Sequence, residues 1–446
     1  MLGSDFAIEY SVLRTPYSVL RTAYFVLRTC YLSLFQSLKR FMPVLLIGTL
    51  DTKGTEIAFV RDQLRQAGLT TLVLDAAVLN PPVFEPDIPR ERVFESAGTS
   101  LAQLQKAADR GLAVEAAARG AAKIAVELHA AGKVDGVLGL GGSAGTTIGT
   151  AAMRALPFGV PKLMVSTLAS GQVQPYVGVR DILMLNSVVD ISGLNRISRT
   201  VLTNAAQAMV GMVSANPQTA IRNAQSDKPL ITATMFGVTT SCVEAARRKM
   251  EEAGFEVLVF HATGTGGRTM ESFIADGMIS GVLDITTTEL ADELVGGVLT
   301  AGRDRLTAAG MHGTPQVISL GALDMVNFGP RSTVPEKFKD RRFYQHNPTV
   351  TLMRTTPEEN DKLGKEIAEK ASAARGPTAI LIPKRGVSAI DREGQSFWWP
   401  EADAALFSSI KHWISPHVEL QELDLHINDP EFAAELTKTL LRFLKR

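Results

Sequence analysis

With 446 residues the chain is long enough for about two domains, and its 46 basic and 46 acidic residues leave no formal net charge. That balance argues against a dedicated nucleic-acid-binding protein, because such proteins usually carry a basic excess. The two cysteines exclude a disulfide framework, so we expect a reducing compartment and a cytoplasmic protein. No uncharged apolar run is long enough to cross a bilayer, so we expect no membrane partner.

Residues 1–41 are dominated by a short repeat. The unit Tyr-Ser-Val-Leu-Arg-Thr begins at Tyr10 and at Tyr17, and returns with one substitution at Tyr24. Its period would place tyrosine and leucine on one helical face beside arginine, as in a membrane-surface or targeting helix. The alternative, which we favour, is translated repetitive DNA upstream of a true start at Met42. We therefore predict a disordered or non-native extension.

From residue 42 to residue 216, short apolar runs alternate with helical patterns. This alternation predicts a mostly parallel sheet flanked by helices on both faces, which is a Rossmann-like α/β subdomain. A glycine or a polar turn follows most of the runs, as expected where a buried strand ends. The expected strands are 44–49, 72–76, 134–140, 161–167 and 182–185.

A polar, turn-rich linker is predicted at 217–228, and a second α/β subdomain of the same kind at 229–446. The two halves share an outline, since Gly48 matches Gly237 and Gly136 matches Gly281 as strand-associated glycines. We hold a diverged duplication as a hypothesis, and it requires the second copy to lack the long loop and helix after its second strand. The expected strands are 230–235, 256–261, 281–285, 315–320, 350–353, 378–382 and 418–427.

Three loops of the first half follow strands and are rich in glycine, serine and threonine. The carboxyl ends of parallel strands share one sheet edge, so we expect these loops to meet. Small residues let the backbone approach a ligand, and the N–H groups and dipole of a helix N-terminus favour an anion. No loop fits a Walker or dinucleotide fingerprint, and tight structural turns are the alternative. The candidate nucleotide-binding residues are Gly48, Thr49, Asp51, Thr52, Lys53, Gly141, Gly142, Ser143, Gly145, Thr146, Thr147, Ser166, Thr167, Ser170 and Gly171.

Two of these candidates are charged. Lys53 is the one cation in the three loops and could meet a β- or γ-phosphate, whereas Asp51 could hold Mg²⁺ through water. The alternatives are a solvated helix start for Lys53 and a helix cap for Asp51. The sequence leaves both pairs of readings open.

The second half carries polar groups suited to acid–base chemistry. His261 ends a predicted strand, and Asp284 and Glu289 bracket a triple-threonine loop, so these three are candidate catalytic residues or Mg²⁺ ligands. The alternative is that each carboxylate caps a helix and that His261 pairs locally. Glycine-rich and threonine-rich turns with an arginine built in also predict a second anion site. Its candidate residues are Thr239, Thr240, Gly264, Gly266, Gly267 and Arg268.

Taken together, the motifs resemble the UPF0261 family, which is also known as the Tm-1-like ATP-binding domain. The resemblance runs from about Met42 to the C-terminus and leaves out the N-terminal repeats. The chain departs from the family at Ala144, where the family usually has glycine. The resembling motifs are 48–54, 139–146, 165–171, 234–240, 260–271, 283–289, 321–330 and 426–429.

The resemblance implies two α/β subdomains, ATP binding at the first-half loops and a homodimer. It also implies a separate TIM-barrel partner protein, because a plant member carries an additional C-terminal domain of that type. We therefore expect an ATP-binding protein. The alternatives are an ATP-dependent enzyme that acts on a small carboxylate or phosphorylated metabolite held by the second half, and a metabolite-binding regulator without turnover.

Overall fold

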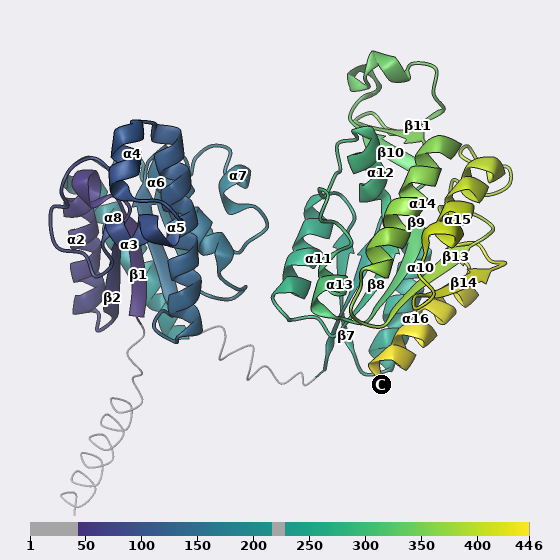
Figure 1. The fold of residues 1–446 in the computed structure, drawn as a ribbon, viewed down its shortest axis with the longest axis horizontal. Coiled ribbons are helices and arrows are strands. Elements are labelled where there is room, and N and C mark those ends of the chain that lie inside the picture. The colour runs from purple at the N-terminus through teal and green to yellow at the C-terminus, as the bar shows by residue number, and fades with distance from the viewer. Residues whose placement is uncertain (1–42, 216–227, 446) are drawn as a thin grey trace, which may run out of the picture. The chain divides into compact units, whose positions relative to one another are not determined.

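The computed structural model of the protein describes residues 43–215 and 228–445. The repeats of residues 1–41 and nearly all of the predicted linker lie outside these ranges. The chain divides into two compact units, one formed mainly by residues before 219 and the other mainly by later residues. Figure 1 draws the first unit in purple to blue and the second in green to yellow.

The first unit contains a five-stranded sheet in which every pair of neighbouring strands is parallel. The strand order is β2-β1-β3-β4-β5, so the chain moves to one side of β1 for β2 and to the other side for β3. The loops after β1 and β3 therefore diverge and leave a crevice at the carboxyl ends of these strands. The strands are β1 (Pro43–Gly48), β2 (Thr70–Asp75), β3 (Gly136–Gly141), β4 (Lys162–Ser166) and β5 (Leu183–Asn186).

Helices cover both faces of this sheet (Figure 1). Successive side chains of a strand point to opposite faces, so Leu45 and Ile47 belong to one core and Val44 and Leu46 to the other. The first core is closed by α3 (Arg90–Ser96), α5 (Arg110–Ala130) and α6 (Ser143–Ala155), and the second by α2 (Leu50–Gln66) and α8 (Arg196–Ala215). The short helices α4 (Leu101–Ala107) and α7 (Gln174–Val177) complete the unit.

The second unit contains a six-stranded parallel sheet of order β14-β13-β9-β8-β6-β7. Its first four strands along the chain have the same relative order as those of the first sheet, as a duplication requires. The two-subdomain α/β fold predicted from the sequence is confirmed. The strands are β6 (Leu230–Met235), β7 (Glu256–His261), β8 (Gly281–Thr286), β9 (Gln316–Gly321), β13 (Thr378–Pro383) and β14 (Glu419–Leu423).

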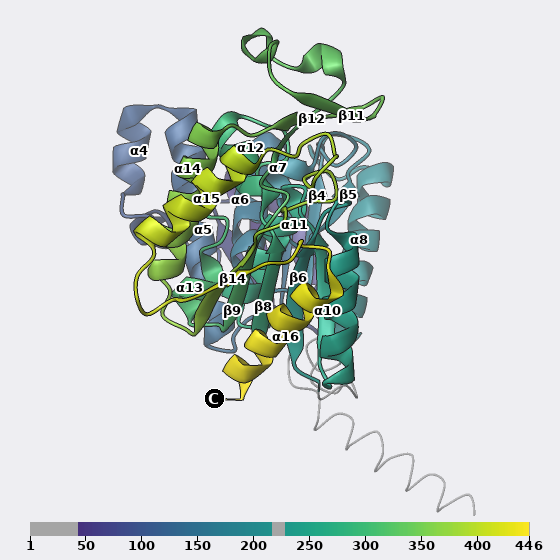
Figure 2. The same cartoon turned by 90° about the vertical axis from the view of Figure 1, so that its right-hand side faces the viewer.

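The helices of the second unit also form two layers. On one face, α10 (Thr240–Glu252) and α16 (Pro430–Leu444) lie side by side (Figure 2). The opposite face is covered by α11 (Thr265–Ala275), α12 (Thr288–Val295), α13 (Ala308–His312), α14 (Pro357–Ser372) and α15 (Pro400–Trp413).

A small antiparallel sheet also belongs to the second unit, in the order β10-β12-β11. It joins β10 (Met325–Phe328) and β11 (Phe343–Asn347) to β12 (Val350–Arg354). The sequence analysis predicted only the last of these strands. The other two are short and have no repeating apolar pattern, and β10 becomes a strand only by pairing with a segment more than twenty residues away.

Candidate functional site

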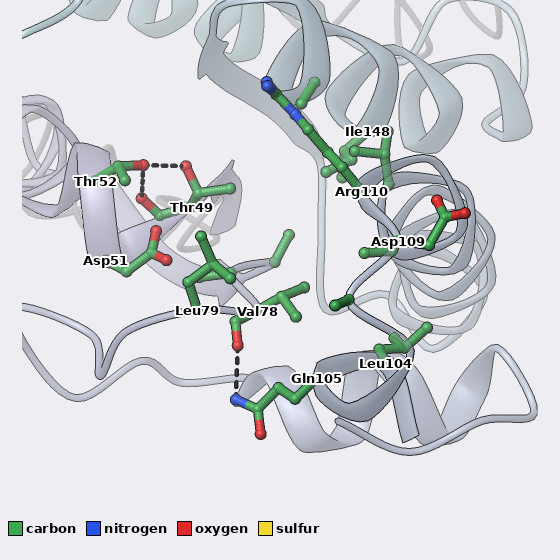
Figure 3. A pocket seen from close by; sticks show the side chains of 16 residues that line it. Thr49, Asp51, Thr52, Val78, Leu79, Leu104, Gln105, Asp109, Arg110 and Ile148 are labelled. Atoms are coloured by element: carbon green, nitrogen blue, oxygen red, sulfur yellow. Dashed lines mark hydrogen bonds between the residues drawn. The ribbon is translucent and has the colours of Figure 1, made fainter. Parts of the chain in front are cut away.

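A cavity of about 420 Å³ lies at the carboxyl ends of β1, β2 and β3 in the first unit. This volume is in the range of small-molecule binding sites. Four stretches of chain form its wall: the start of α2, the segment after β2, the break between α4 and α5, and the first turns of α6. Figure 3 shows Thr49, Asp51 and Thr52 on one side and Leu104, Asp109 and Arg110 on another, with Leu79 between them.

Most of the wall is apolar, with a few polar groups at its margins. Leu79 is 76% exposed, so a large aliphatic surface is available to a flat ligand. Gln105 donates from Nε2 to the carbonyl of Val78 at 2.7 Å, which leaves its amide oxygen available. Asp109 accepts a hydrogen bond of 3.0 Å from the N–H of Leu112 and thereby caps α5. A few fixed polar groups in an apolar slot are typical of a small-molecule site.

The break between α4 and α5 shapes this wall. Ala108 adopts a left-handed conformation with φ of 49°, which ends α4 and lets α5 begin two residues later. The turn brings Ala108, Asp109 and Arg110 to the cavity together. The sequence analysis did not single out these residues, because they lie in an alanine-rich helical stretch without a recognisable motif.

The start of α6 forms the glycine turn at which the sequence predicted an anion site. Gly142 occupies the N-cap position and supplies no side-chain cap, so the first N–H groups of α6 have no side-chain acceptor there. Ala144, in the first turn, lines the cavity. The departure from the family's usual glycine therefore lies in the cavity wall.

The glycines of this turn have different roles. A Cβ on Gly141 would lie 2.6 Å from the Cα of Gly145, so β3 and α6 approach this closely only because the side chain is absent. A Cβ on Gly142 would meet nothing nearer than the hydroxyl of Thr167, at 3.6 Å. Packing therefore requires glycine at 141 but not at 142, where a small residue keeps the first turn of α6 accessible.

Several predicted residues support the loops without lining the cavity. Thr146 and Ser166 are buried, and a hydrogen bond of 2.7 Å between their hydroxyls joins the loops after β3 and β4. A Cβ on Gly48 would lie 2.7 Å from the terminal methyl of Ile57, so β1 and α2 pack closely here. The hydroxyl of Thr147 donates to the Ser143 carbonyl within α6. The N–H of Thr167 donates to the Gly141 carbonyl. Ser170 and Gly171 are exposed on the loop after β4.

Lys53 and Asp51, the charged candidates, occupy different surroundings. The Nζ of Lys53 donates to the carbonyl of Ile191, and Lys53 does not line the cavity. Asp51 does line it and accepts a hydrogen bond of 3.3 Å from the N–H of Asn80. Thr49, rather than Asp51, occupies the N-cap position of α2. Among the described residues, no group of three or more His, Cys, Asp or Glu is placed to hold a metal ion.

Asp75, at the end of β2, organises two of the cavity walls. Its Oδ1 accepts hydrogen bonds from the N–H groups of Leu50, at 2.9 Å, and Ala77, at 3.0 Å. These bonds hold the start of α2 and the segment after β2 together. Burial raises the pKa of Asp75 against the effect of these two bonds, and its Oδ2 has no hydrogen-bond partner. The sequence analysis placed Asp75 within the expected strand 72–76 and gave it no further role.

In the second unit, the predicted catalytic carboxylates meet at an arginine that the sequence analysis missed. Arg305 is fully buried and donates to Asp284 at 2.5 and 2.6 Å and to Glu289 at 2.6 Å. It also donates to Glu271 at 3.2 Å. A buried guanidinium bonded to three carboxylates is a structural ion-pair network, and Arg305 lies in an irregular stretch that gave no signal for it.

The side chain of Glu289 occupies the turn that was predicted as a second anion site. It accepts hydrogen bonds from the N–H groups of Gly264, at 2.7 Å, and Gly267, at 3.1 Å. A Cβ on Gly267 would lie 2.2 Å from a Glu289 carboxylate oxygen. The turn does bind an anion, but that anion is the protein's own carboxylate. Gly266 packs closely against the His261 carbonyl, and Arg268 is exposed and donates to the Gly264 carbonyl.

His261 lies at the protein surface, unlike the buried carboxylates of Asp284 and Glu289. It is exposed and packs edge to face on Phe236, with ring centroids 5.5 Å apart, whereas Asp284 and Glu289 are buried. Thr239 is buried and shares a hydrogen bond of 2.7 Å with Thr286, and Thr240 bonds to the Phe236 carbonyl. The structure therefore does not bring His261 together with the two buried carboxylates, and Thr239 and Thr240 bond locally.

Comparison with known proteins identifies the family. Residues 42–218 match the model described as "Uncharacterised protein family (UPF0261) N-terminal domain", and residues 228–444 match that of the C-terminal domain. The chain belongs to the UPF0261 family. A UPF0261 protein of Clostridium tetani is 50% identical over 404 residues, which cover 90% of this chain and 99% of that protein.

Two further comparisons concern a plant relative and a solved structure. The tomato ToMV resistance protein Tm-1(GCR237), from Solanum lycopersicum, is 39% identical over 416 residues, which cover 89% of this UPF0261 chain and 55% of the plant protein. A glycosyltransferase of Streptomyces sp. SF2575, solved with thymidine diphosphate, matches at 14% sequence identity and a TM-score of 0.17. The matched region covers 62% of this chain and 81% of the glycosyltransferase chain. Structural similarity this weak carries no argument about function. No described helix is long and apolar enough to cross a membrane.

Proposed function

We propose that this UPF0261 protein binds ATP in the cavity at the carboxyl ends of β1, β2 and β3. The supporting observation is that a mostly apolar slot of about 420 Å³ adjoins the first turn of α6, whose N-cap residue is glycine. The slot suits a purine ring and the helix start suits phosphate. Both lie beside β1, where the strand order reverses and open α/β sheets bind ligands.

In this arrangement the phosphates lie against the N–H groups of Ser143 and the residues that follow it. The ring packs on Leu79 and the other apolar side chains of the wall. Asp51 and Asp109 are available to the ribose hydroxyls. Asp51 is also the carboxylate at the α2 margin of the cavity, so it could bind Mg²⁺ through water together with phosphate oxygens, which is the usual mode for Mg²⁺.

The oligomeric state, a partner protein and the cellular location are proposed from the family resemblance alone. We propose a homodimer and a separate TIM-barrel partner protein, with the cytoplasm as the location. Light scattering on the purified chain tests the dimer, and co-purification with TIM-barrel proteins encoded in the same genome tests the partner. The plant relative's name refers to virus resistance, and we do not extend that activity to a chain that covers 55% of its length.

Calorimetric titration with ATP, with and without Mg²⁺, tests the nucleotide proposal. We expect ATP to bind more tightly than adenosine or inorganic tripolyphosphate, because only ATP fills both the slot and the helix start. A folded protein that binds none of the three would overturn the proposal. Following ADP release then separates a binding protein from an ATP-dependent enzyme that acts on a small carboxylate or phosphorylated metabolite.

A further inference from the structure

A second cavity, of about 190 Å³, lies at the carboxyl end of β13 in the second unit. Open α/β sheets bind ligands at this edge. The cavity is formed by two stretches of chain. One is the turn after β13, and the other is one face of α15 together with Trp398, two residues before that helix. Its lining residues are Lys384, Arg385, Gly386, Trp398, Pro400, Asp403, Ala404 and Phe407.

The local sequence explains how the two stretches meet. Gly386 has φ of +123°, and a Cβ there would lie 1.7 Å from the carbonyl oxygen of Asp391, so only glycine permits this turn. On α15, Pro400, Asp403 and Phe407 are spaced by three and four residues, which places them on one helical face. The turn and the helix face together enclose the cavity.

The polar part of the lining has an excess of positive charge. Arg385 pairs with the exposed Asp424 at 2.8 Å, and the charges of Arg385 and Lys384 both lower the pKa of that carboxyl. The one carboxylate in the wall, Asp403, is buried and bonded to Arg354 at 2.6 Å. Arg354 therefore offsets part of the Asp403 charge, and Lys384 and Arg385 outnumber the one carboxylate in the lining.

The apolar part of the lining includes two aromatic rings. Trp398 is 43% exposed although it is large and apolar, and Phe407 lies in the same wall. Exposed aromatic surface beside polar groups is common where a ligand with an apolar body and a polar end binds. The volume of about 190 Å³ lies below the usual range for sites of drug-sized ligands and suits a smaller occupant.

We propose that this cavity binds a small organic anion, namely a carboxylate attached to a flat apolar group. Lys384 and Arg385 attract the carboxylate, and Trp398 and Phe407 contact the apolar group. This site is distinct from the nucleotide cavity and does not depend on ATP binding. Its lining includes neither Asp284 nor Glu289, the carboxylates that the sequence nominated for catalysis, and both of these are bonded to Arg305.

Benzoate, titrated into the full chain and followed by calorimetry and tryptophan fluorescence, tests the proposal. Benzamide has the same ring without the charge, and acetate has the charge without the ring. We expect benzoate to bind at least tenfold more tightly than either. Absence of benzoate binding, or equal binding of the three, would refute the proposal.

Variants then locate the binding site. The double variant Lys384→Gln/Arg385→Gln is expected to weaken benzoate binding at least tenfold, and Trp398→Phe to remove the fluorescence change while the protein still binds. The matched control Lys411→Gln removes an exposed cation of the same unit, one that pairs with Glu422, and is expected to leave binding unchanged. Full binding by the double variant, with its fold verified by circular dichroism, would place the anion elsewhere.

Discussion

The guanidinium of Arg305 holds the carboxylate of Asp284 through two hydrogen bonds, of 2.5 and 2.6 Å, with both side chains almost completely buried. The pair links the end of β8 to the irregular segment after α12. Arg305 also bonds to Glu289, so its single positive charge is shared by both carboxylates that the sequence nominated for catalysis. The three side chains join β8, α12 and the segment after α12 within the second unit.

The first prediction concerns this network. Replacing Arg305 with alanine leaves Asp284 and Glu289 buried without their cation, and we expect a loss of about 3–5 kcal/mol in the free energy of unfolding. Urea denaturation measures the loss. The control Arg247→Ala removes an arginine that pairs only at the surface, and it should change stability little. If both variants lose the same small amount, Arg305 does not stabilise the fold.

The second prediction concerns the N-cap of α6. In Gly142→Asp, the new carboxylate can accept the first-turn N–H bonds that phosphate would otherwise use, so we expect unchanged or slightly higher thermal stability. The same carboxylate repels the phosphates, so ATP affinity should fall by more than tenfold. Gly142→Asn caps the helix without the charge and should lose less affinity. Retained affinity in the aspartate variant would contradict a phosphate site at this turn.

The third prediction concerns Lys53. Because its ammonium group donates to the Ile191 carbonyl, we expect Lys53→Met to change ATP affinity less than about threefold, or ~0.7 kcal/mol. We expect Lys53→Met instead to lower the free energy of unfolding modestly, because the hydrogen bond to the Ile191 carbonyl is lost. Lys123→Met, on the exposed side of α5, controls for the general loss of a positive charge. A tenfold loss specific to the Lys53 variant would show that this side chain turns to the phosphates when ATP binds.

The fourth prediction concerns Ala144. Its methyl group projects from the first turn of α6 into the cavity wall, so Ala144→Gly should raise ATP affinity by about threefold, or ~0.7 kcal/mol. The glycine should also lower stability by less than about 1 kcal/mol. Ala155→Gly, at the exposed far end of the same helix, should lower stability without changing affinity. An unchanged affinity in Ala144→Gly would mean that phosphate lies away from this turn.

The fifth prediction concerns pH. Burial raises the pKa of Asp292 to about 7, although it accepts hydrogen bonds from the N–H groups of Asn327 and Leu299. The folded state therefore binds a proton more tightly than the unfolded state, whose carboxyl titrates near the ordinary value of 3.8. The contribution of this group to stability is accordingly present at low pH and is lost as pH rises toward about 7.

Urea denaturation across this pH range measures the effect. Relative to Asp292→Asn, the wild-type protein should lose up to about 1.4 kcal/mol of stability for each unit of rising pH between the two pKa values. Asparagine cannot ionise, although it also loses acceptor capacity and should lower stability at every pH. Parallel pH profiles for the two proteins would contradict a raised pKa at Asp292.

Much of the fold was predictable because buried parallel strands appear in the sequence as short apolar runs between helical patterns. Thus the runs that became β1, β3, β6 and β8 were identified without a structure, and so was the glycine turn that contains Gly141, Gly142 and Gly145. The small strands β10 and β11 were missed because their pairing is non-local. The motifs also identified the UPF0261 family, which the comparisons confirm.

The sequence alone determined the two α/β units, the family and the glycine turn at which an anion is proposed to bind. Only the tertiary structure showed which polar groups are still free to bind a ligand. Asp284, Glu289 and the Gly264–Gly267 turn resemble a site in the sequence, but Arg305 bonds to both carboxylates, and Glu289 in turn accepts the N–H groups of Gly264 and Gly267. At Gly142 the side-chain cap is absent, and that absence leaves the first turn of α6 open to a ligand. A motif specifies the chemical groups, whereas burial and distant partners decide which of those groups remain available.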